Sequence, residues 1–120
     1  MTTILIIDDD RHIRSILRHM LERAGYTVME ASNGHEGVQH VRGALPDLII
    51  TDIFMPEKEG LETIRELRRL CPESKILAIS GGGRTGALDF LGVAEKLGAQ
   101  RTLRKPFLRQ ELLEAVRELV

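Results

Sequence analysis

The sequence of 120 residues contains one cysteine, no long apolar run and almost no excess charge. Cys71 alone cannot form a disulfide within the chain, and no neighbouring histidine or second cysteine gives it the spacing of a zinc site. The longest apolar runs, such as Ile4–Ile7 and Leu48–Ile50, are far too short to cross a bilayer. The 17 basic and 18 acidic side chains leave a formal charge of −1, which favours neither nucleic acid nor an anionic membrane as partner.

What remains is the composition of an ordinary globular domain. Hydrophobic residues make up 42% of the chain and charged residues 29%, which excludes a disordered or fibrous protein. A chain of this length is long enough to bury one core. Met1–Thr3 lead directly into a strand-like run, without the basic stretch or cleavage site of a secretion signal. We therefore expect one soluble, cytoplasmic domain.

Strand-like and helix-like segments alternate along the chain. Residues 4–7 form a continuous aliphatic run typical of a buried strand, and further strands are predicted over residues 26–31, 48–51, 75–80 and 102–104. Apolar stripes at helical spacing fall within residues 13–24, 38–41, 61–70, 88–97 and 112–119. Helix ends are marked by Gly25, Leu45-Pro46, Cys71-Pro72 and Gly98. Five successive strand–helix units without a long linker predict a single α/β domain with a parallel sheet, right-handed crossovers and helices on both faces.

Ligands of an open parallel sheet bind beyond the carboxyl ends of its strands, so the residues that follow each predicted strand carry the functional signal. These residues are Asp8, Asp9 and Asp10 after the first strand, Asp52 after the third, Ser80 and Gly81 after the fourth, and Lys105-Pro106 after the fifth. Adjacent strands would bring at least three carboxylates, one hydroxyl and one ammonium to one edge of the sheet.

Such a group of carboxylates needs a positive charge to offset their repulsion. A ligand set made of oxygen alone, without His or Cys, favours Mg²⁺ over zinc. Magnesium bound by a few carboxylates leaves one aspartate free as a nucleophile. The lysine ammonium and the hydroxyl are suited to phosphoryl oxygens. This chemistry is phosphoryl transfer to an aspartate.

Four motifs, in this order along the chain, resemble the receiver domain of two-component response regulators. They are Ile4-Leu5-Ile6-Ile7-Asp8-Asp9-Asp10, Asp52-Ile53-Phe54-Met55-Pro56 with Gly60, Ile79-Ser80-Gly81, and Lys105-Pro106-Phe107. The resemblance covers the whole chain. It implies a doubly wound, flavodoxin-like (βα)5 fold with strand order 2-1-3-4-5, and an acyl phosphate formed on Asp52.

The resemblance also implies the metal ligands. Mg²⁺ would be held directly by Asp9, Asp52 and the main-chain carbonyl of Phe54, with Asp8 acting through water. An aspartyl-phosphate phosphohydrolase would need a second Asp two residues after the nucleophile, and that position is Phe54. This alternative is therefore disfavoured. An adaptor that never carries phosphate is disfavoured by the complete set of acidic residues, Ser80 and Lys105.

By the same resemblance, Ser80 would sense the phosphoryl group and Lys105 would pair with it. The Lys105–Pro106 peptide is expected to be cis, which proline allows at low energetic cost. The switch region would comprise Ser80, Gly81 and Thr102. Receivers usually carry Phe or Tyr where this chain has Thr102, so the usual aromatic readout cannot operate in its usual form.

Two further departures fall near the same face. The glycines of Gly81–Gly83 make the connection after the fourth strand look longer than usual. Because glycines tolerate many backbone angles, the phosphorylation signal is expected to pass through Gly81–Gly86 and the start of the next helix. This segment lacks the Lys and Ser/Thr of a phosphate-binding loop, since Ala87-Leu88 stand at those positions. Leu108 occupies the place of a Ser, Thr or Asp cap before the last helix.

Other polar residues have simpler interpretations. Asp10 is expected to be a helix N-terminal residue rather than a ligand. The four histidines are expected on helix surfaces; they are His12, His19, His35 and His40.

The predicted function is that of a phosphoacceptor in a two-component phosphorelay. The phosphoryl donor would be a phosphohistidine of a sensor histidine kinase or a histidine phosphotransfer protein. The chain would catalyse only its own phosphorylation and slow autodephosphorylation, and it would act on an unidentified protein target as a monomer or weak homodimer, without binding nucleic acid or membranes. Residues 1–120 would be one receiver domain without an output domain, either alone or as part of a longer regulator.

Overall fold

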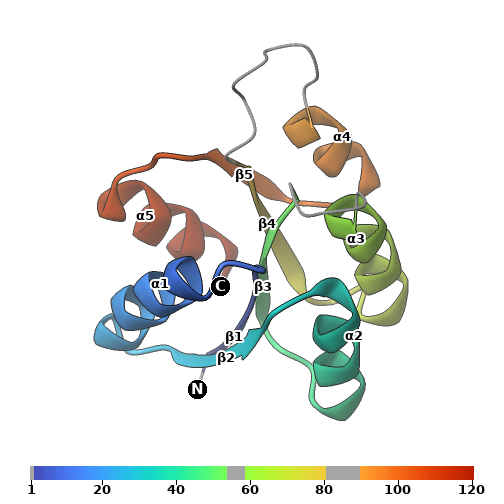
Figure 1. The fold of residues 1–120 in the computed structure, drawn as a ribbon, viewed down its shortest axis with the longest axis horizontal. Coiled ribbons are helices and arrows are strands. Elements are labelled where there is room, and N and C mark those ends of the chain that lie inside the picture. The colour runs from blue at the N-terminus through green and yellow to red at the C-terminus, as the bar shows by residue number, and fades with distance from the viewer. Residues whose placement is uncertain (1, 54–58, 81–89) are drawn as a thin grey trace.

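The computed structural model describes residues 2–53, 59–80 and 90–120. They form an α/β fold in which a sheet lies between two layers of helices (Figure 1). Strands and helices alternate as the sequence predicts. The strands are β1 (Thr3–Ile7), β2 (Thr27–Ala31), β3 (Leu48–Asp52), β4 (Lys75–Ser80) and β5 (Arg101–Arg104). The helices are α1 (Arg11–Arg23), α2 (Gly34–Gly43), α3 (Glu59–Leu70), α4 (Phe90–Leu97) and α5 (Arg109–Leu119).

All five strands run parallel in one sheet of order β2-β1-β3-β4-β5, which confirms the predicted fold class and strand order. β1 lies between β2 and β3, and Ile7 is opposite Ala31 on one side and Thr51 on the other. β3 pairs with β4 so that Asp52 is opposite Ile79. The ends of β1 and β3 are therefore neighbours, as the convergence of their aspartates requires.

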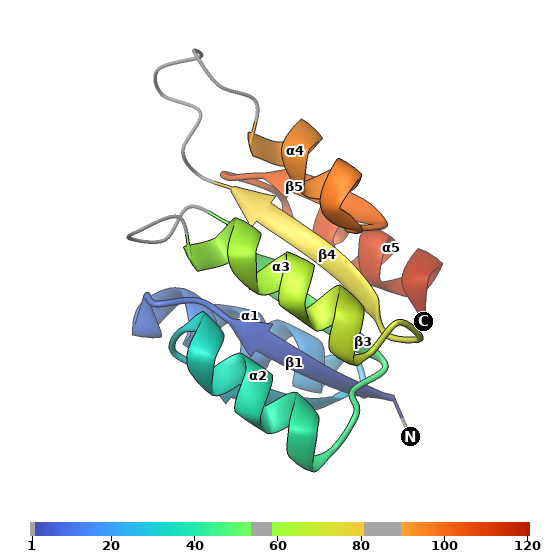
Figure 2. The same cartoon turned by 90° about the vertical axis from the view of Figure 1, so that its right-hand side faces the viewer.

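Helices cover both faces of the sheet. α1 and α5 lie on one face, and α2, α3 and α4 lie on the other (Figures 1 and 2). Alternate residues of each strand therefore enter two separate cores, because successive side chains point to opposite faces. In β1, Ile4 and Ile6 pack with α1 and α5, whereas Leu5 and Ile7 pack with α2 and α3. Burial on both faces explains why the central strands are continuous apolar runs.

The helix boundaries follow local chemistry. The Asp10 carboxylate accepts hydrogen bonds from the main-chain N–H groups of His12 and Ile13, so Asp10 caps α1 as expected. Asn33 caps α2 in the same way through the N–H of Glu36. Gly25 and Gly98 follow α1 and α4 with φ of 99° and 128°, a region of backbone conformation that favours glycine.

The last helix begins without a capping side chain at its first position, as Leu108 predicts. Its cap comes instead from Glu111, whose carboxylate accepts a hydrogen bond of 2.7 Å from the Leu108 N–H. The Leu108 side chain is 70% exposed. Half of a capping box is therefore enough to begin α5, and the leucine is left at the surface.

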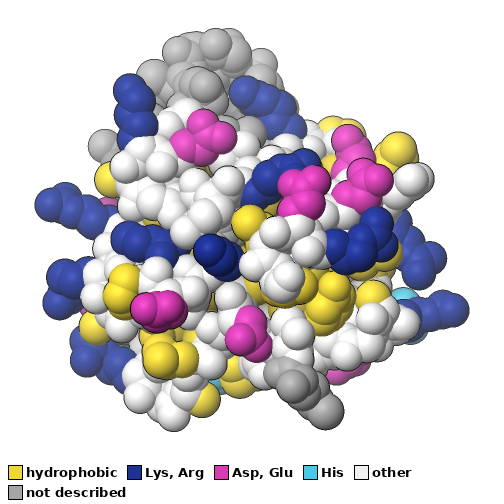
Figure 3. Space-filling model, turned by 180° about the vertical axis from the view of Figure 1, so that it is seen from behind, with side chains coloured by type: hydrophobic (Ala, Val, Ile, Leu, Met, Phe, Trp, Pro, Cys, Tyr) yellow, Lys and Arg dark blue, Asp and Glu magenta, His cyan; other side chains and the backbone are white. Residues whose placement is uncertain are grey.

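The outer surface carries both signs of charge. Basic and acidic side chains are interspersed over the face drawn in Figure 3, in keeping with the formal charge of −1. The four histidines are exposed on or beside α1 and α2, as expected. Within residues 2–53, 59–80 and 90–120, the structure contains no helix with the length and apolar character of a membrane span.

Candidate functional site

Three carboxylates meet at the carboxyl ends of β1 and β3. One oxygen each from Asp8, Asp9 and Asp52 lies within 4.8 Å of the others. Asp8 and Asp52 are buried, with 2% and 6% of their surface exposed, whereas Asp9 is exposed. The sheet order brings these residues together across 44 positions of the chain, because β1 and β3 are direct neighbours. Asp10 caps α1 and is not part of this cluster.

Asp8 is fixed at the end of β1 by hydrogen bonds with the main chain. Its N–H donates to the Ala31 carbonyl over 3.2 Å, and its Oδ1 accepts from the Asp10 N–H over 2.8 Å. Burial raises the pKa of Asp8 to about 6, and the charge of Asp52 adds to the rise. The Asp10 N–H and the Lys105 ammonium act in the opposite direction and do not cancel it. The ionised cluster therefore stores an electrostatic cost that a bound cation would relieve.

Lys105 joins the two buried carboxylates. Its Nζ lies 3.3 Å from Asp52 Oδ2 and 3.4 Å from Asp8 Oδ2. Burial lowers the pKa of Lys105, but the carboxylates of Asp52 and Asp8 outweigh that effect and raise it, so the ammonium stays charged at neutral pH. The Lys105–Pro106 peptide is cis, as the resemblance implies. One ammonium thus faces two buried carboxylates.

Ser80 completes the edge of the sheet beside this pair. It is 5% exposed at the end of β4, and its carbonyl accepts a 2.8 Å hydrogen bond from the Lys105 N–H. This bond continues the β4–β5 pairing and fixes the start of the segment that carries the lysine. Thr102 lies two positions further back in the ladder, opposite Ala78, and is half-buried. The structure therefore brings Ser80 and Lys105 to the same end of the sheet as the acidic cluster.

Two residues of the predicted site lie outside the described residues. They are Phe54, predicted to offer a main-chain carbonyl to the metal, and Gly81 of the predicted switch region. The same holds for the Met55-Pro56 turn and for the Gly81–Gly86 segment that was expected to carry the signal.

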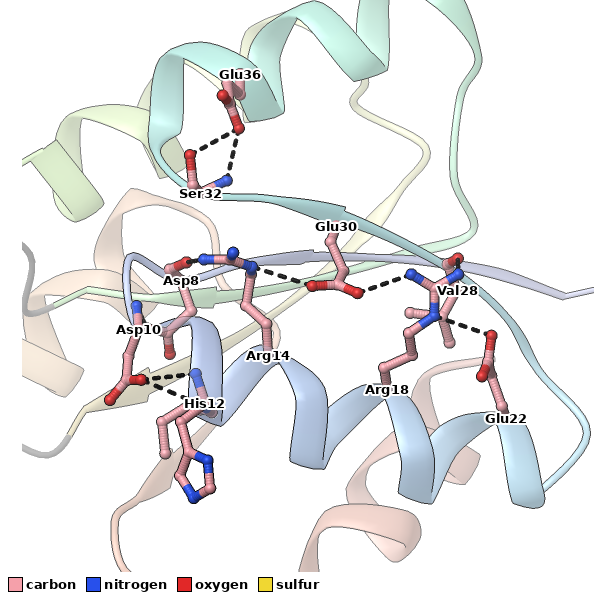
Figure 4. Close-up of polar contacts among 11 residues, drawn as sticks. Asp8, Asp10, His12, Arg14, Arg18, Glu22, Val28, Glu30, Ser32 and Glu36 are labelled. Carbon is pink, nitrogen blue, oxygen red and sulfur yellow. Dashed lines mark hydrogen bonds and ion pairs between the residues drawn. The ribbon is translucent and has the colours of Figure 1, made fainter.

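An ion-pair network behind Asp8 was not predicted from the sequence (Figure 4). Arg14 of α1 donates to the Asp8 main-chain carbonyl over 2.7 Å and to Glu30 of β2 over 3.1 Å. Arg18 donates to the other carboxylate oxygen of Glu30 over 2.7 Å. One signal was available: Glu30 is a charged residue within a predicted strand, and a charge that a strand partly buries needs a partner.

The donor set fits a hard divalent cation. Among the described residues, the cluster offers three carboxylates and neither sulfur nor imidazole, which is the ligand chemistry of Mg²⁺. The raised pKa of Asp8 fits this interpretation, because burial and the charge of Asp52 both disfavour its ionised form and a bound cation would offset both effects. Asp9 and Asp52, with Asp8 beside them, are the described residues that could hold the ion.

Comparison with known proteins agrees with this arrangement. The family model of the response regulator receiver domain matches residues 4–117, and the chain belongs to this family. It is 34% identical over 117 residues to the chemotaxis protein CheY of Thermotoga maritima, covering 97% of this chain and 95% of that protein. It is 36% identical to the response regulator MprA of Mycobacterium ulcerans, where the match covers 98% of this chain but only 49% of the relative. The chain thus spans nearly all of one relative and about half of the other.

Solved structures show the same fold. A CheY-like response regulator receiver domain protein from Methanospirillum hungatei superposes with a TM-score of 0.90 at 30% identity, covering 98% of this chain and 92% of that one. The response regulator TrrA of Thermotoga maritima, solved in complex with Mg²⁺ and BeF, gives a TM-score of 0.84 at 31% identity over the full length of both chains.

Proposed function

We propose that this chain is the phosphoacceptor of a two-component phosphorelay and that Asp52 accepts the phosphoryl group. The observation that carries the proposal is the position of the Lys105 ammonium, 3.3 Å from the Asp52 carboxylate and 3.4 Å from that of Asp8. Membership of the receiver family supports the assignment. The phosphoryl donor would be a phosphohistidine of a sensor histidine kinase or of a histidine phosphotransfer protein.

In the proposed reaction, a carboxylate oxygen of Asp52 attacks the phosphorus of the donor. A P–O bond forms as the P–N bond breaks, and the electron pair of the broken bond stays on the imidazole nitrogen of the donor. The product on this chain is an acyl phosphate. Lys105 contributes by position and charge, because its ammonium already lies where phosphoryl oxygens on Asp52 would need a donor. Water later cleaves the acyl phosphate and regenerates the carboxylate.

Asp9, Asp52 and Asp8 would hold Mg²⁺, which when bound neutralises charge on the phosphoryl oxygens. The burial of Asp8 and Asp52 keeps both carboxylates in a medium where charge interactions are stronger than in water. The resemblance that implies this metal also implies a ligand from the Phe54 carbonyl.

The proposed output is a change in which protein partner the chain binds. Ser80, buried at the end of β4, would donate its hydroxyl to the phosphoryl group and draw the end of β4 with it, and the change would pass along the chain toward the start of α4. Because Thr102 is small, the change would pass through the backbone rather than through an aromatic side chain. The protein would act in the cytoplasm, as a monomer or weak homodimer.

Exposure to a small-molecule phosphodonor, followed by intact-mass measurement, tests the proposal. With Mg²⁺ present, we expect the mass to rise by one phosphoryl group, and with a chelator in excess we expect little or no change. A chain that stays unmodified under both conditions would be an adaptor rather than a phosphoacceptor. Steady release of inorganic phosphate from many equivalents of an unrelated phosphate ester would indicate a phosphohydrolase instead.

A further inference from the structure

The main chain of Asp8 is held from outside the acidic cluster by the side chain of Arg14. The Arg14 Nη1 donates to the Asp8 carbonyl over 2.7 Å, which is short for a bond from a charged nitrogen to a neutral oxygen. Figure 4 shows the guanidinium reaching from α1 to the end of β1. Only 14% of the Arg14 side chain is exposed, so water cannot easily replace this bond.

The orientation of Arg14 is itself fixed. Its Nε donates to Glu30 of β2 over 3.1 Å, while its Nη1 donates to Asp8 at the end of β1. The guanidinium therefore links the two neighbouring strands. The other oxygen of Glu30 is occupied by Arg18, which also donates to the Val28 carbonyl over 3.3 Å and to Glu22 over 3.0 Å. A guanidinium has a rigid planar fork of donors and can make two such bonds at once, whereas an ammonium cannot reproduce that geometry.

We propose that Arg14 is a positioning residue for the acidic cluster, which holds the Asp8–Asp9 main chain so that both carboxylates face Asp52. The inference rests on the proposed function in one respect, namely that the cluster binds Mg²⁺. A group behind a metal ligand commonly tunes affinity by fixing that ligand's orientation, and losing it typically costs 10–100-fold in metal binding. Arg14 is suited to this task because it contacts the backbone between two of the proposed ligands, and its described hydrogen bonds go to the Asp8 carbonyl and to Glu30 rather than to a carboxylate of the cluster.

Arg18 provides a matched control on the same helix. It forms an ion pair with the same glutamate, and 42% of its side chain is exposed. Its hydrogen bonds go to Glu22, Val28 and Glu30, and none of those described for it reaches Asp8. If the network acted only by stabilising the fold, replacing either arginine would have the same effect on Mg²⁺ binding. If Arg14 acts on Asp8, replacing Arg14 will weaken Mg²⁺ binding and replacing Arg18 will not.

The test compares the wild-type chain with Arg14→Met and Arg18→Met, after thermal melts have shown that each is folded. Calorimetric titration with MgCl₂ gives the metal affinity, and amide hydrogen exchange by NMR in metal-free buffer gives the protection of the Asp8 and Asp10 N–H groups. We expect Arg14→Met to weaken Mg²⁺ binding about tenfold and to accelerate exchange at both amides. Arg18→Met should lower the melting temperature without either change.

Arg14→Lys keeps the positive charge, and it replaces Arg14→Met in the test if that variant does not fold. It should bind Mg²⁺ less tightly than the wild type, because lysine lacks the rigid planar fork with which Arg14 bonds the Asp8 carbonyl and Glu30. Wild-type affinity in Arg14→Lys, or equal losses in the Arg14 and Arg18 variants, would overturn the inference. If the wild-type chain binds no Mg²⁺, the proposed function fails. The exchange measurement in metal-free buffer then still decides whether Arg14 positions Asp8.

Discussion

The Lys105 ammonium lies 3.3 Å from the Asp52 carboxylate although 53 residues separate the two in the sequence. The hydrogen bond from the Lys105 N–H to the Ser80 carbonyl and the pairing of β3 with β4 fix their relative position. The same ammonium lies 3.4 Å from Asp8. A single cation therefore balances part of the charge of two buried carboxylates, and the site is assembled by the sheet rather than by a loop.

Replacing Lys105 should impair the response to phosphorylation more than it impairs folding. In Lys105→Ala, the buried Asp8, whose pKa is already raised to about 6, can take up a proton and so limit the electrostatic cost. The bond from the ammonium to a phosphoryl oxygen has no such substitute. We expect a small fall in melting temperature. Beryllofluoride, a mimic of the phosphoryl group, should change the protection of amide hydrogens from exchange in the wild type, and most of that change should be lost in the variant. Lys75→Ala, at the exposed start of β4, is the control. Outright unfolding of Lys105→Ala would mark the lysine as structural.

Removing a buried carboxylate should stabilise the metal-free protein and weaken metal binding. Burial raises the pKa of Asp8 from 3.8 to about 6, so its ionised form opposes folding at neutral pH. Asp8→Asn should therefore raise the free energy of unfolding in a chelator by about 1–3 kcal/mol. Asp9→Asn, at an exposed position, should weaken Mg²⁺ binding with little change in stability. Denaturant unfolding with and without Mg²⁺ measures both effects. A destabilised, metal-free Asp8→Asn would contradict the account.

The Glu30 network should make stability depend on pH in the acid range. The hydrogen bond from Arg18, opposed by burial and aided by Arg14, holds the pKa of Glu30 below its ordinary value of 4.5. A lowered pKa in the folded state means that the contribution is present above that ordinary value and is lost as the pH falls through the lowered one.

Glu30→Gln should therefore be less stable than the wild type by about 1 kcal/mol at neutral pH. The gap should narrow as the pH falls below 4.5. Urea unfolding across this range checks the prediction, and a gap that widens in acid would contradict it.

The turn after α4 should not tolerate a side chain. Gly98 has a φ of 128°, and a Cβ there would lie 2.9 Å from the Arg68 Nε. Arg68 cannot withdraw without losing its bonds to the carbonyls of Pro72 and Gly98. Gly98→Ala should cost about 1–3 kcal/mol of stability. Gly43→Ala, with open space around the new methyl group, is the control and should be neutral or slightly stabilising. Equal stability of the two variants would refute this prediction.

The sequence predicted the order and type of every helix and strand, because each signal was local. Continuous aliphatic runs marked β1 and β3, and Gly25 and Gly98 marked helix ends by a conformation that glycine adopts readily. The ends of α2 and α3 were less well determined. α2 stops at Gly43, ahead of the Leu45-Pro46 pair that was expected to end it, and α3 begins at Glu59. Helix ends depend on hydrogen bonds that a neighbouring element can extend or replace.

The membership of the acidic cluster was also predictable, since parallel strands end at one edge of the sheet. The hydrogen bonds that hold the cluster in place were not predictable. The bond from Arg14 to the Asp8 carbonyl depends on the rotation of α1 over β1, and the pairing of Ile6 with Glu30 in the ladder decides whether Glu30 reaches Arg14. Likewise, Asp8 is buried and Asp9 is exposed although both are aspartates, because packing decides this difference and residue type does not.

The most direct test of the account is phosphoryl labelling of Asp52→Asn beside Asp10→Asn. Asn at position 10 can still cap α1, so that control keeps both the fold and the acidic cluster. With a small-molecule phosphodonor and Mg²⁺, intact-mass measurement should show one acid-stable, base-labile phosphoryl group on the wild type and on Asp10→Asn. Asp52→Asn should show none while remaining folded. Full labelling of Asp52→Asn at another residue would contradict the central claim.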